Sequence, residues 1–185
     1  MTRSLVTMRE ARLSDASALA ELWQPYLRRG AGDALDDLAS VIEHLDQEPG
    51  HRLVVAEYDG AFAGAVFLKT AAYSPLNPEL VLQVHNPAVV AEHRRHGVGK
   101  ALVECAVTWA EELGIGHVAT ATSSGSREAN RFMARIALAP QAVLRMAPTP
   151  AVRARLANRN PGTRQMSQVI AVRRSLRSAR SVSGR

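Results

Sequence analysis

The 185-residue sequence contains one cysteine, Cys105, so no disulfide can form within the chain. A lone thiol fits a reducing compartment, in which disulfides are rare. Long apolar runs are also missing, because none reaches the roughly 18 residues that a membrane-spanning helix needs. No apolar stretch of signal-peptide type follows Met1. We therefore expect a soluble, cytoplasmic protein that does not bind membranes.

Aromatic residues make up only 4% of the chain, which disfavours a protein that stacks nucleic-acid bases on aromatic rings. No Asp or Glu follows Glu128, and that final stretch carries twelve arginines. Such a basic third could bind nucleic acid or ribosomes, attract an anionic ligand, or reflect a coding bias toward arginine. All three interpretations stay open, and we treat nucleic-acid binding as a secondary role.

Hydrophobic residues make up 46% of the sequence, which suits one globular domain with a core of its own. We predict that this domain spans residues 1–173. Residues 174–185 are rich in serine and arginine and nearly free of apolar side chains. That composition predicts a disordered basic tail.

The first half of the sequence predicts a strand, two helices and a hairpin. A strand at residues 6–11 precedes a helix at residues 15–28, for which Ser14 is a candidate N-cap. A second amphipathic helix follows. An Asp-Gly turn then joins two β-rich runs, residues 52–57 and 62–70, in a tight hairpin.

The second half predicts strands that alternate with helices. Residues 80–90 read as a long strand in which Pro87 requires a bulge or an edge position. Residues 98–113 have the clearest helical spacing. Further strands are predicted at residues 117–122, 142–146 and 165–173, with helices at residues 126–136 and 148–158. This order indicates an α/β fold, a mixed and partly parallel twisted sheet of about seven strands with helices on both faces.

A basic, glycine-containing segment separates the long strand from the clearest helix, and it reads Arg94, Arg95, His96, Gly97, Val98, Gly99, Lys100. Glycines leave the backbone open to a ligand. The first N–H groups of a helix and the helix dipole favour an anion. We therefore predict that this segment binds a diphosphate. The alternative is a tight strand-to-helix turn with solvated basic side chains.

The segment resembles the signature of the GNAT N-acetyltransferase superfamily, which is Arg or Gln, two residues, Gly, one residue, then Gly or Ala. Arg94, Gly97 and Gly99 match that signature. By the order of elements, the resemblance covers residues 6–147. It implies an enzyme that transfers an acetyl group from acetyl-CoA to the amine of a small molecule or protein, without a metal. Related folds exchange their last strand between subunits, which leaves a homodimer open.

The resemblance also implies roles for individual residues. Val89 and Val90 would offer main-chain groups to the pantetheine arm of CoA, on a fourth strand that bulges and splays from the fifth. Asn130 would hold the same arm. Where many members carry a tyrosine as general acid, this chain has Met133. That departure leaves three readings open: weak activity, a substitute donor such as Tyr73 or Ser124, or a non-catalytic CoA-binding regulator that associates with nucleic acid or ribosomes through its basic third.

The acceptor amine must lose a proton before it can attack, so a general base is expected. His85 lies on the long strand, and the ordinary pKa of histidine, about 6.5, suits this task. Glu79 and Glu92 are the rival candidates. Acidic residues near Asp33 hint at a cationic acceptor such as an amine or a peptide N-terminus, or form a solvated helix face.

Overall fold

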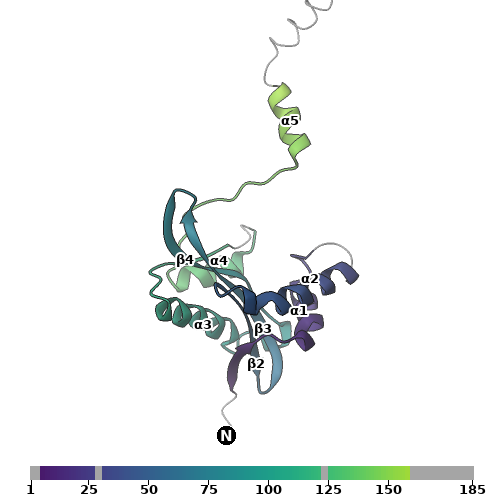
Figure 1. Cartoon of the computed structure of the whole chain (residues 1–185), viewed down its shortest axis with the longest axis vertical. Coiled ribbons are helices and arrows are strands. Elements are labelled where there is room, and N and C mark those ends of the chain that lie inside the picture. Colours follow the sequence, from purple (N-terminus) through teal and green to yellow (C-terminus); the bar gives the residue numbers. More distant parts are fainter. Residues whose placement is uncertain (1–4, 28–30, 122–124, 159–185) are drawn as a thin grey trace, which may run out of the picture. The chain divides into compact units, whose positions relative to one another are not determined.

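The computed structural model describes residues 5–27, 31–121 and 125–158 (Figure 1). Contacts between residues divide the chain into two units, Met1–Ala139 and Pro140–Arg185. Within its described residues, the first unit holds a five-stranded sheet in the order β1-β2-β3-β4-β5 and the helices α1 to α4. The described part of the second unit holds α5, Thr149–Asn158, in agreement with the helix predicted there.

The sheet is antiparallel from β1 to β4 and parallel between β4 and β5. Its strands are β1 Val6–Glu10, β2 His51–Tyr58, β3 Ala61–Ser74, β4 Asn77–Val89 and β5 Val118–Thr120. The helices are α1 Ala16–Trp23, α2 Ala31–His44, α3 Val98–Glu112 and α4 Arg127–Arg135. The predicted mixed, partly parallel sheet is therefore confirmed.

Helices cover both faces of the sheet, with α3 on one side and the α1–α2 pair on the other (Figure 1). On the α3 side, Leu68 and Leu82 pack with Leu102 and Trp109 in one core cluster. On the other side, the core cluster contains Leu19, Trp23, Leu38, Leu53 and Val55. Because both faces are buried, the central strands are apolar at successive positions instead of alternating with polar residues.

The predicted number of strands, about seven, is wrong for the part of the chain that the structure describes, which forms five. Residues 142–146 were expected as a strand but have no regular structure, and Val143, Leu144 and Met146 are exposed. A β-rich run makes a strand only when a neighbouring strand pairs with it. The strand predicted at residues 165–173 and the tail at residues 174–185 lie outside the described residues.

Two tight turns join antiparallel strands of the sheet, and the sequence predicted one of them. The Asp59-Gly60 turn is confirmed, since both residues have the positive φ angles, 49° and 83°, that such a tight turn requires. Between the strands predicted at residues 62–70 and 80–90, β3 extends to Ser74 and β4 starts at Asn77, so that the two strands meet in a second tight turn. There the Ser74 hydroxyl accepts hydrogen bonds from the N–H groups of Leu76 and Asn77. β4 therefore begins at Asn77, three residues earlier than predicted.

The first helix is shorter than predicted, and its N-cap is not Ser14. Ser14 lies inside a 3-10 turn, Leu13–Asp15, and the N-cap position of α1 belongs to Asp15. The helix ends at Trp23, because Pro25 follows two residues later.

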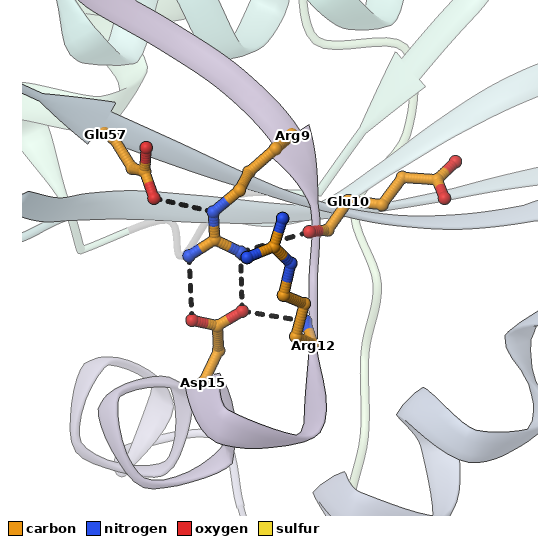
Figure 2. A network of polar contacts seen from close by, with 5 residues as sticks. All are labelled: Arg9, Glu10, Arg12, Asp15 and Glu57. Carbon is orange, nitrogen blue, oxygen red and sulfur yellow. Dashed lines mark hydrogen bonds and ion pairs between the residues drawn. The ribbon is translucent and has the colours of Figure 1, made fainter. Parts of the chain in front are cut away.

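Asp15 is buried in a polar network that joins the start of α1 to the sheet (Figure 2). Its two carboxylate oxygens accept hydrogen bonds from both Nη atoms of Arg9, at 2.7 and 2.9 Å. One of them also accepts from the main-chain N–H of Arg12 at 2.7 Å. Arg9 Nε donates to Glu57 on β2 at 2.6 Å. Arg9 thus links β1, β2 and α1 through paired charges.

Candidate active site

β4 contains a bulge at Asn86 and Pro87. The pairing of β4 with β3 shifts by one residue across these two positions. Pro87 has no N–H for the ladder, and Asn86 adopts a left-handed φ of 47°. The indole N–H of Trp23 donates to the Asn86 carbonyl at 2.8 Å, which ties the bulge to the end of α1. The bulge expected from Pro87 is confirmed.

The ladder between β4 and β5 is short. It pairs residues 82–84 with residues 118–120, and at its end the Thr120 hydroxyl donates to the Val84 carbonyl at 2.8 Å. Within the described residues, β4 continues for five further positions to Val89 with no β5 partner. Among the described residues, the bulge and the residues that follow it therefore have no strand partner on that edge.

A cavity of about 1110 Å³ lies against this free part of β4. Four segments of the first unit line it: the end of α1, the β4 bulge, the loop before α3, and α4. Its volume slightly exceeds the usual range for ligand pockets, about 300–1,000 Å³. Six of the ten predicted cofactor residues line it: Val89, Arg94, Arg95, Gly97, Gly99 and Lys100.

The loop before α3 presents a row of main-chain N–H groups. The first helical hydrogen bond of α3 runs from Ala101 N–H to the Gly97 carbonyl at 3.0 Å. No acceptor among the described residues bonds to the N–H groups of residues 95–100. Arg95 and Gly97 have left-handed φ angles of 66° and 86°. When left-handed residues alternate with right-handed ones, successive N–H groups turn to one side and form a concavity that can hold an anion. N–H groups that are exposed in this way have the geometry that anions bind in other proteins.

The two glycines of the loop leave open space. A Cβ atom on Gly97 would meet nothing within 4 Å, although its positive φ disfavours other residues. A Cβ atom on Gly99 would meet only Val89 Cγ2, at an ordinary contact distance of 3.6 Å. Packing within the chain therefore does not require glycine at position 99, whereas a ligand that approaches the backbone would benefit from it.

Two predicted cofactor residues have side chains that pack inside the protein, although their main-chain N–H groups belong to the row at residues 95–100, and a third has both main-chain groups bonded. Val98 is 1% exposed and belongs to the core beneath α3. The His96 ring packs against Tyr58 on β2, with centroids 4.8 Å apart. Val90 donates its N–H to the Ala63 carbonyl at 2.9 Å, and its own carbonyl accepts from His93 N–H at 3.0 Å. Both main-chain groups of Val90 are thus already hydrogen-bonded inside the protein.

Asn130 does not line the cavity, but Ser126 does. The Asn130 side-chain amide donates to the Ser126 carbonyl at 2.7 Å, within α4. Ser126 is the N-cap of α4, and its hydroxyl accepts from Ala129 N–H at 3.4 Å. Sequence reasoning missed Ser126 as a site residue, although a serine before an amphipathic helix is a capping signal.

His85 lies on β4, two residues before the cavity wall begins at Pro87. Its Nε2 lies 3.1 Å from Gln83 Oε1, so the neutral ring that donates this proton keeps its lone pair on Nδ1. Partial burial lowers the pKa of His85 below its ordinary value, and the positive charges of Lys69 and His51 lower it further. At neutral pH the ring is therefore held in its neutral, basic form.

Tyr73 is not brought to the cavity. It is 63% exposed on β3, nine residues beyond Gly64, whose partner on β4 is Val89. At about 3.3 Å per residue, that separation is about 30 Å along the strand. The tyrosine that lines the cavity is Tyr26, beyond the end of α1. Ser124, the other substitute donor, lies outside the described residues.

α4 ends in a left-handed turn of the kind that usually contains glycine, but the residue at that position is Ala137. Ala137 has a left-handed φ of 64°, and the next N–H, that of Leu138, donates to the Met133 carbonyl at 3.0 Å. Ala137→Gly is expected to raise the free energy of unfolding by about 1 kcal/mol, because it relieves this strain. Urea unfolding would measure it, and Ala134→Gly inside α4 is the opposite control, expected to cost about 1 kcal/mol. A destabilised Ala137→Gly protein would contradict the expectation.

The lone cysteine shows no sign of nucleophilic activation. Cys105 is half-buried on α3, and burial raises the pKa of its thiol, which disfavours a thiolate. Among the residues described, no three or more His, Cys, Asp or Glu side chains gather where they could hold a metal ion. None of the described helices is long and apolar enough to span a bilayer.

Comparisons with solved structures place the fold among known proteins. A transcriptional regulator from Bacillus halodurans C-125 matches 78% of this chain and 100% of its own length, with a TM-score of 0.68 and 18% identity. Glucosamine-6-phosphate N-acetyltransferase from Arabidopsis thaliana covers 78% and 99%, with a TM-score of 0.62 and 17% identity. An aminoglycoside N-acetyltransferase in complex with CoA covers 79% and 95%, with a TM-score of 0.65 and 15% identity. At such identities these likenesses show the fold alone.

A sequence model of the family described as "Acetyltransferase (GNAT) family" matches residues 16–137. No curated protein sequence matches the chain significantly. The matched span is more than half of the chain, and it includes the bulged strand, the loop before α3 and α4. The chain therefore belongs to the GNAT acetyltransferase family.

Proposed function

We propose that this protein is an N-acetyltransferase that uses acetyl-CoA to acetylate an amine. The observation that supports the proposal best is the row of unbonded N–H groups at residues 95–100, which opens into a basic cavity. Diphosphates bind well at such helix N-termini. Arg94, Arg95 and Lys100 surround these groups on the same wall and would add charge-assisted hydrogen bonds.

The cavity has suitable places for the rest of the cofactor. The edge of β4 at Ala88 and Val89 would run beside the pantetheine arm, and Ser126 lines the same cavity. Acetyl-CoA would supply a thioester whose carbonyl carbon accepts the amine, so that a C–N bond forms and the C–S bond breaks. Leu22, Pro25 and Tyr26 close the α1 end and would contact the acceptor.

Two proton transfers accompany this reaction. His85 is the candidate base that takes the proton from the ammonium acceptor, directly or through a water. Tyr26 is the candidate donor to the departing sulfur, since it is the tyrosine among the described residues that line the cavity. Coenzyme A thiolate is a fair leaving group, so the contribution of Tyr26 is smaller than that of His85.

His85→Ala is expected to lower kcat/KM by about 100-fold near pH 7, the size of a general-base contribution. The ratio of wild type to variant should shrink toward 1 as the pH approaches about 10, where a typical amine deprotonates without help. Because the pKa of His85 is lowered, the wild-type advantage should persist below pH 6.5. A ratio that stays flat with pH would exclude His85 as the base, and His85→Gln controls for the loss of ring volume.

The proposed activity can be tested by mixing the protein with acetyl-CoA and a panel of amines while free thiol is measured. Amine-dependent thiol release is the expected result. Thermal-shift measurements with acetyl-CoA and longer acyl-CoAs would establish binding independently. Binding without turnover on any amine would contradict the proposal.

Met133 favours a second candidate, a catalytically weak CoA-binding regulator. Its side chain is 7% exposed, lines the cavity and cannot donate a proton. This candidate predicts the same CoA binding with negligible acetyl transfer. Association with nucleic acid or ribosomes through the basic C-terminal third would accompany it, and steeply salt-sensitive RNA binding would be the measurement.

A further inference from the structure

α4 places three arginines along the cavity. Arg127, Arg131 and Arg135 follow one another at intervals of four residues, and all three line the cavity wall. At about 1.5 Å per residue and 100° per residue, they form one stripe about 12 Å long within about 80° of the helix surface. The three guanidinium groups therefore face the same space as the loop before α3.

The charge of this stripe is not neutralised within the protein. In the described ranges, none of the three arginines forms an ion pair, whereas Lys100 pairs with Glu104 at 3.0 Å. The cavity wall carries six basic residues and one acidic residue, Glu128, a net formal charge of +5. Like charges four residues apart destabilise a helix. An anion held between these arginines would remove that repulsion.

In the proposed function the loop before α3 takes the diphosphate of CoA, which leaves the stripe for a different group. CoA carries one more anionic group, the phosphate on the 3′-hydroxyl of its ribose. A phosphate monoester carries about −1.5 to −2 charges at pH 7 and three strong acceptor oxygens. Guanidinium groups match such oxygens with paired hydrogen bonds.

We infer that the arginine stripe Arg127, Arg131 and Arg135 is a second anion subsite of the cavity, and that it binds the 3′-phosphate of CoA. The inference rests on the proposed function, since it assumes that CoA occupies the cavity. Its consequence is discrimination between two cofactors that differ only in this phosphate, CoA and dephospho-CoA. The acetyl group, the thioester and the diphosphate are the same in both.

Calorimetric titration of CoA and dephospho-CoA into wild type and variants tests the inference. Wild type should bind dephospho-CoA about tenfold more weakly than CoA, the loss of about one charged hydrogen-bond pair. Arg131→Gln should reduce that preference to about threefold, and the triple glutamine variant should abolish it. Arg131→Lys keeps the positive charge but loses the planar guanidinium group, so its preference for CoA should lie between the preferences of wild type and Arg131→Gln.

Two controls accompany the titrations. Arg155→Gln removes the same charge from an exposed position on α5 that does not line the cavity, so the tenfold preference should persist. Thermal unfolding should show the stripe variants to be as stable as wild type or more so, because they lose like-charge repulsion. The preference should also weaken in high salt, because both partners are solvent-accessible.

The outcomes separate this inference from the proposed function. If neither CoA nor dephospho-CoA binds wild type, the proposed function fails, and the inference fails with it. If both bind wild type equally, the inference is overturned while the proposed function stands. If the triple variant keeps the tenfold preference but loses kcat/KM for an acceptor, the stripe binds an anionic acceptor and the inference is again overturned.

Discussion

Gly99→Glu is expected to weaken acetyl-CoA binding by about 100-fold while the protein stays at least as stable as wild type. Binding and stability should respond differently, because the proposed ligand requires a small residue at position 99 and the fold does not. A Cβ atom there meets only Val89 Cγ2, at 3.6 Å. The residue lies in the first turn of α3, at its second position.

The stability of the Gly99→Glu protein follows from helix physics. Replacement of a helical glycine removes backbone entropy from the unfolded chain and gains about 0.5–1 kcal/mol. A carboxylate in the first turn also interacts favourably with the helix dipole, by about 0.3–1 kcal/mol. The same carboxylate would occupy the N–H groups that the diphosphate needs, and it would repel the phosphates. Loss of two charge-assisted hydrogen bonds, about 3 kcal/mol, corresponds to the expected 100-fold loss.

Two matched variants identify the cause. Gly99→Ala adds only the Cβ atom, and Gly99→Gln adds the volume of glutamate without its charge. Binding should therefore weaken slightly for alanine, more for glutamine and most for glutamate, as measured by calorimetry at low salt. Equal binding by the glutamine and glutamate variants would show that no anion lies at the start of α3, and the proposed cofactor site would be wrong.

The features that sequence alone could predict are those encoded by neighbouring residues. The Asp59-Gly60 turn, the apolar stripe of α3 and the glycine loop each depend on a few consecutive side chains and backbone angles. The bulge at Pro87 belongs to the same class, because a proline lacks the N–H that a ladder needs. For these features the structure agrees with the expectation within one or two residues.

Features that depend on distant partners were missed or misplaced. Tyr73 was a reasonable proton donor while its strand was thought to end near Thr70, but β3 extends to Ser74 and carries Tyr73 far from Val89. Tyr26 reaches the cavity because α1 stops early at Trp23. The α4 arginines line the same cavity as the loop before α3, although about 30 residues separate the two in the sequence. No local pattern records these placements.

The capping residue of α1 shows how a long-range pair overrides a local preference. Serine is among the best N-caps, so Ser14 was expected to begin the helix. The bidentate pairing of Asp15 with Arg9 from β1 instead draws residues 13–15 into a 3-10 turn. The comparison that matters is between the two losses: leaving Arg9 without its buried partner costs about 3 kcal/mol, whereas losing one capping hydrogen bond costs about 1 kcal/mol.

Asp15→Ala is accordingly expected to lower the free energy of unfolding by about 3 kcal/mol. The residue is only 8% exposed, and its removal leaves both Nη atoms of Arg9 without their acceptor. Loss of one partner of a buried pair costs about 3–5 kcal/mol, and the partial exposure of Arg9 favours the lower end of that range. Urea denaturation at pH 7 would measure the loss. Glu57→Gln, which affects the more exposed Arg9 contact, should cost about 1 kcal/mol or less.

The pH dependence of that loss has a definite sign. Hydrogen bonds from Arg9 hold the pKa of the Asp15 carboxyl below its ordinary value, although burial acts in the opposite direction. A carboxyl with a lowered pKa in the folded state contributes stability that is fully present above its unfolded pKa, about 3.9. This contribution disappears as the pH falls through the folded-state pKa. The difference between wild type and Asp15→Ala should thus be constant from pH 7 to about pH 5 and shrink below about pH 4.

The double variant Arg9→Met, Asp15→Ala distinguishes an ion pair from simple packing. If the cost of Asp15→Ala arises from the uncompensated guanidinium, removal of that charge should recover at least half of the lost stability, because an apolar replacement of a buried pair is often nearly neutral. If the cost arises from lost contacts at the start of α1, the two substitutions should add, and the double variant should be the least stable. Additive losses would mean that the network in Figure 2 acts through volume and not through charge.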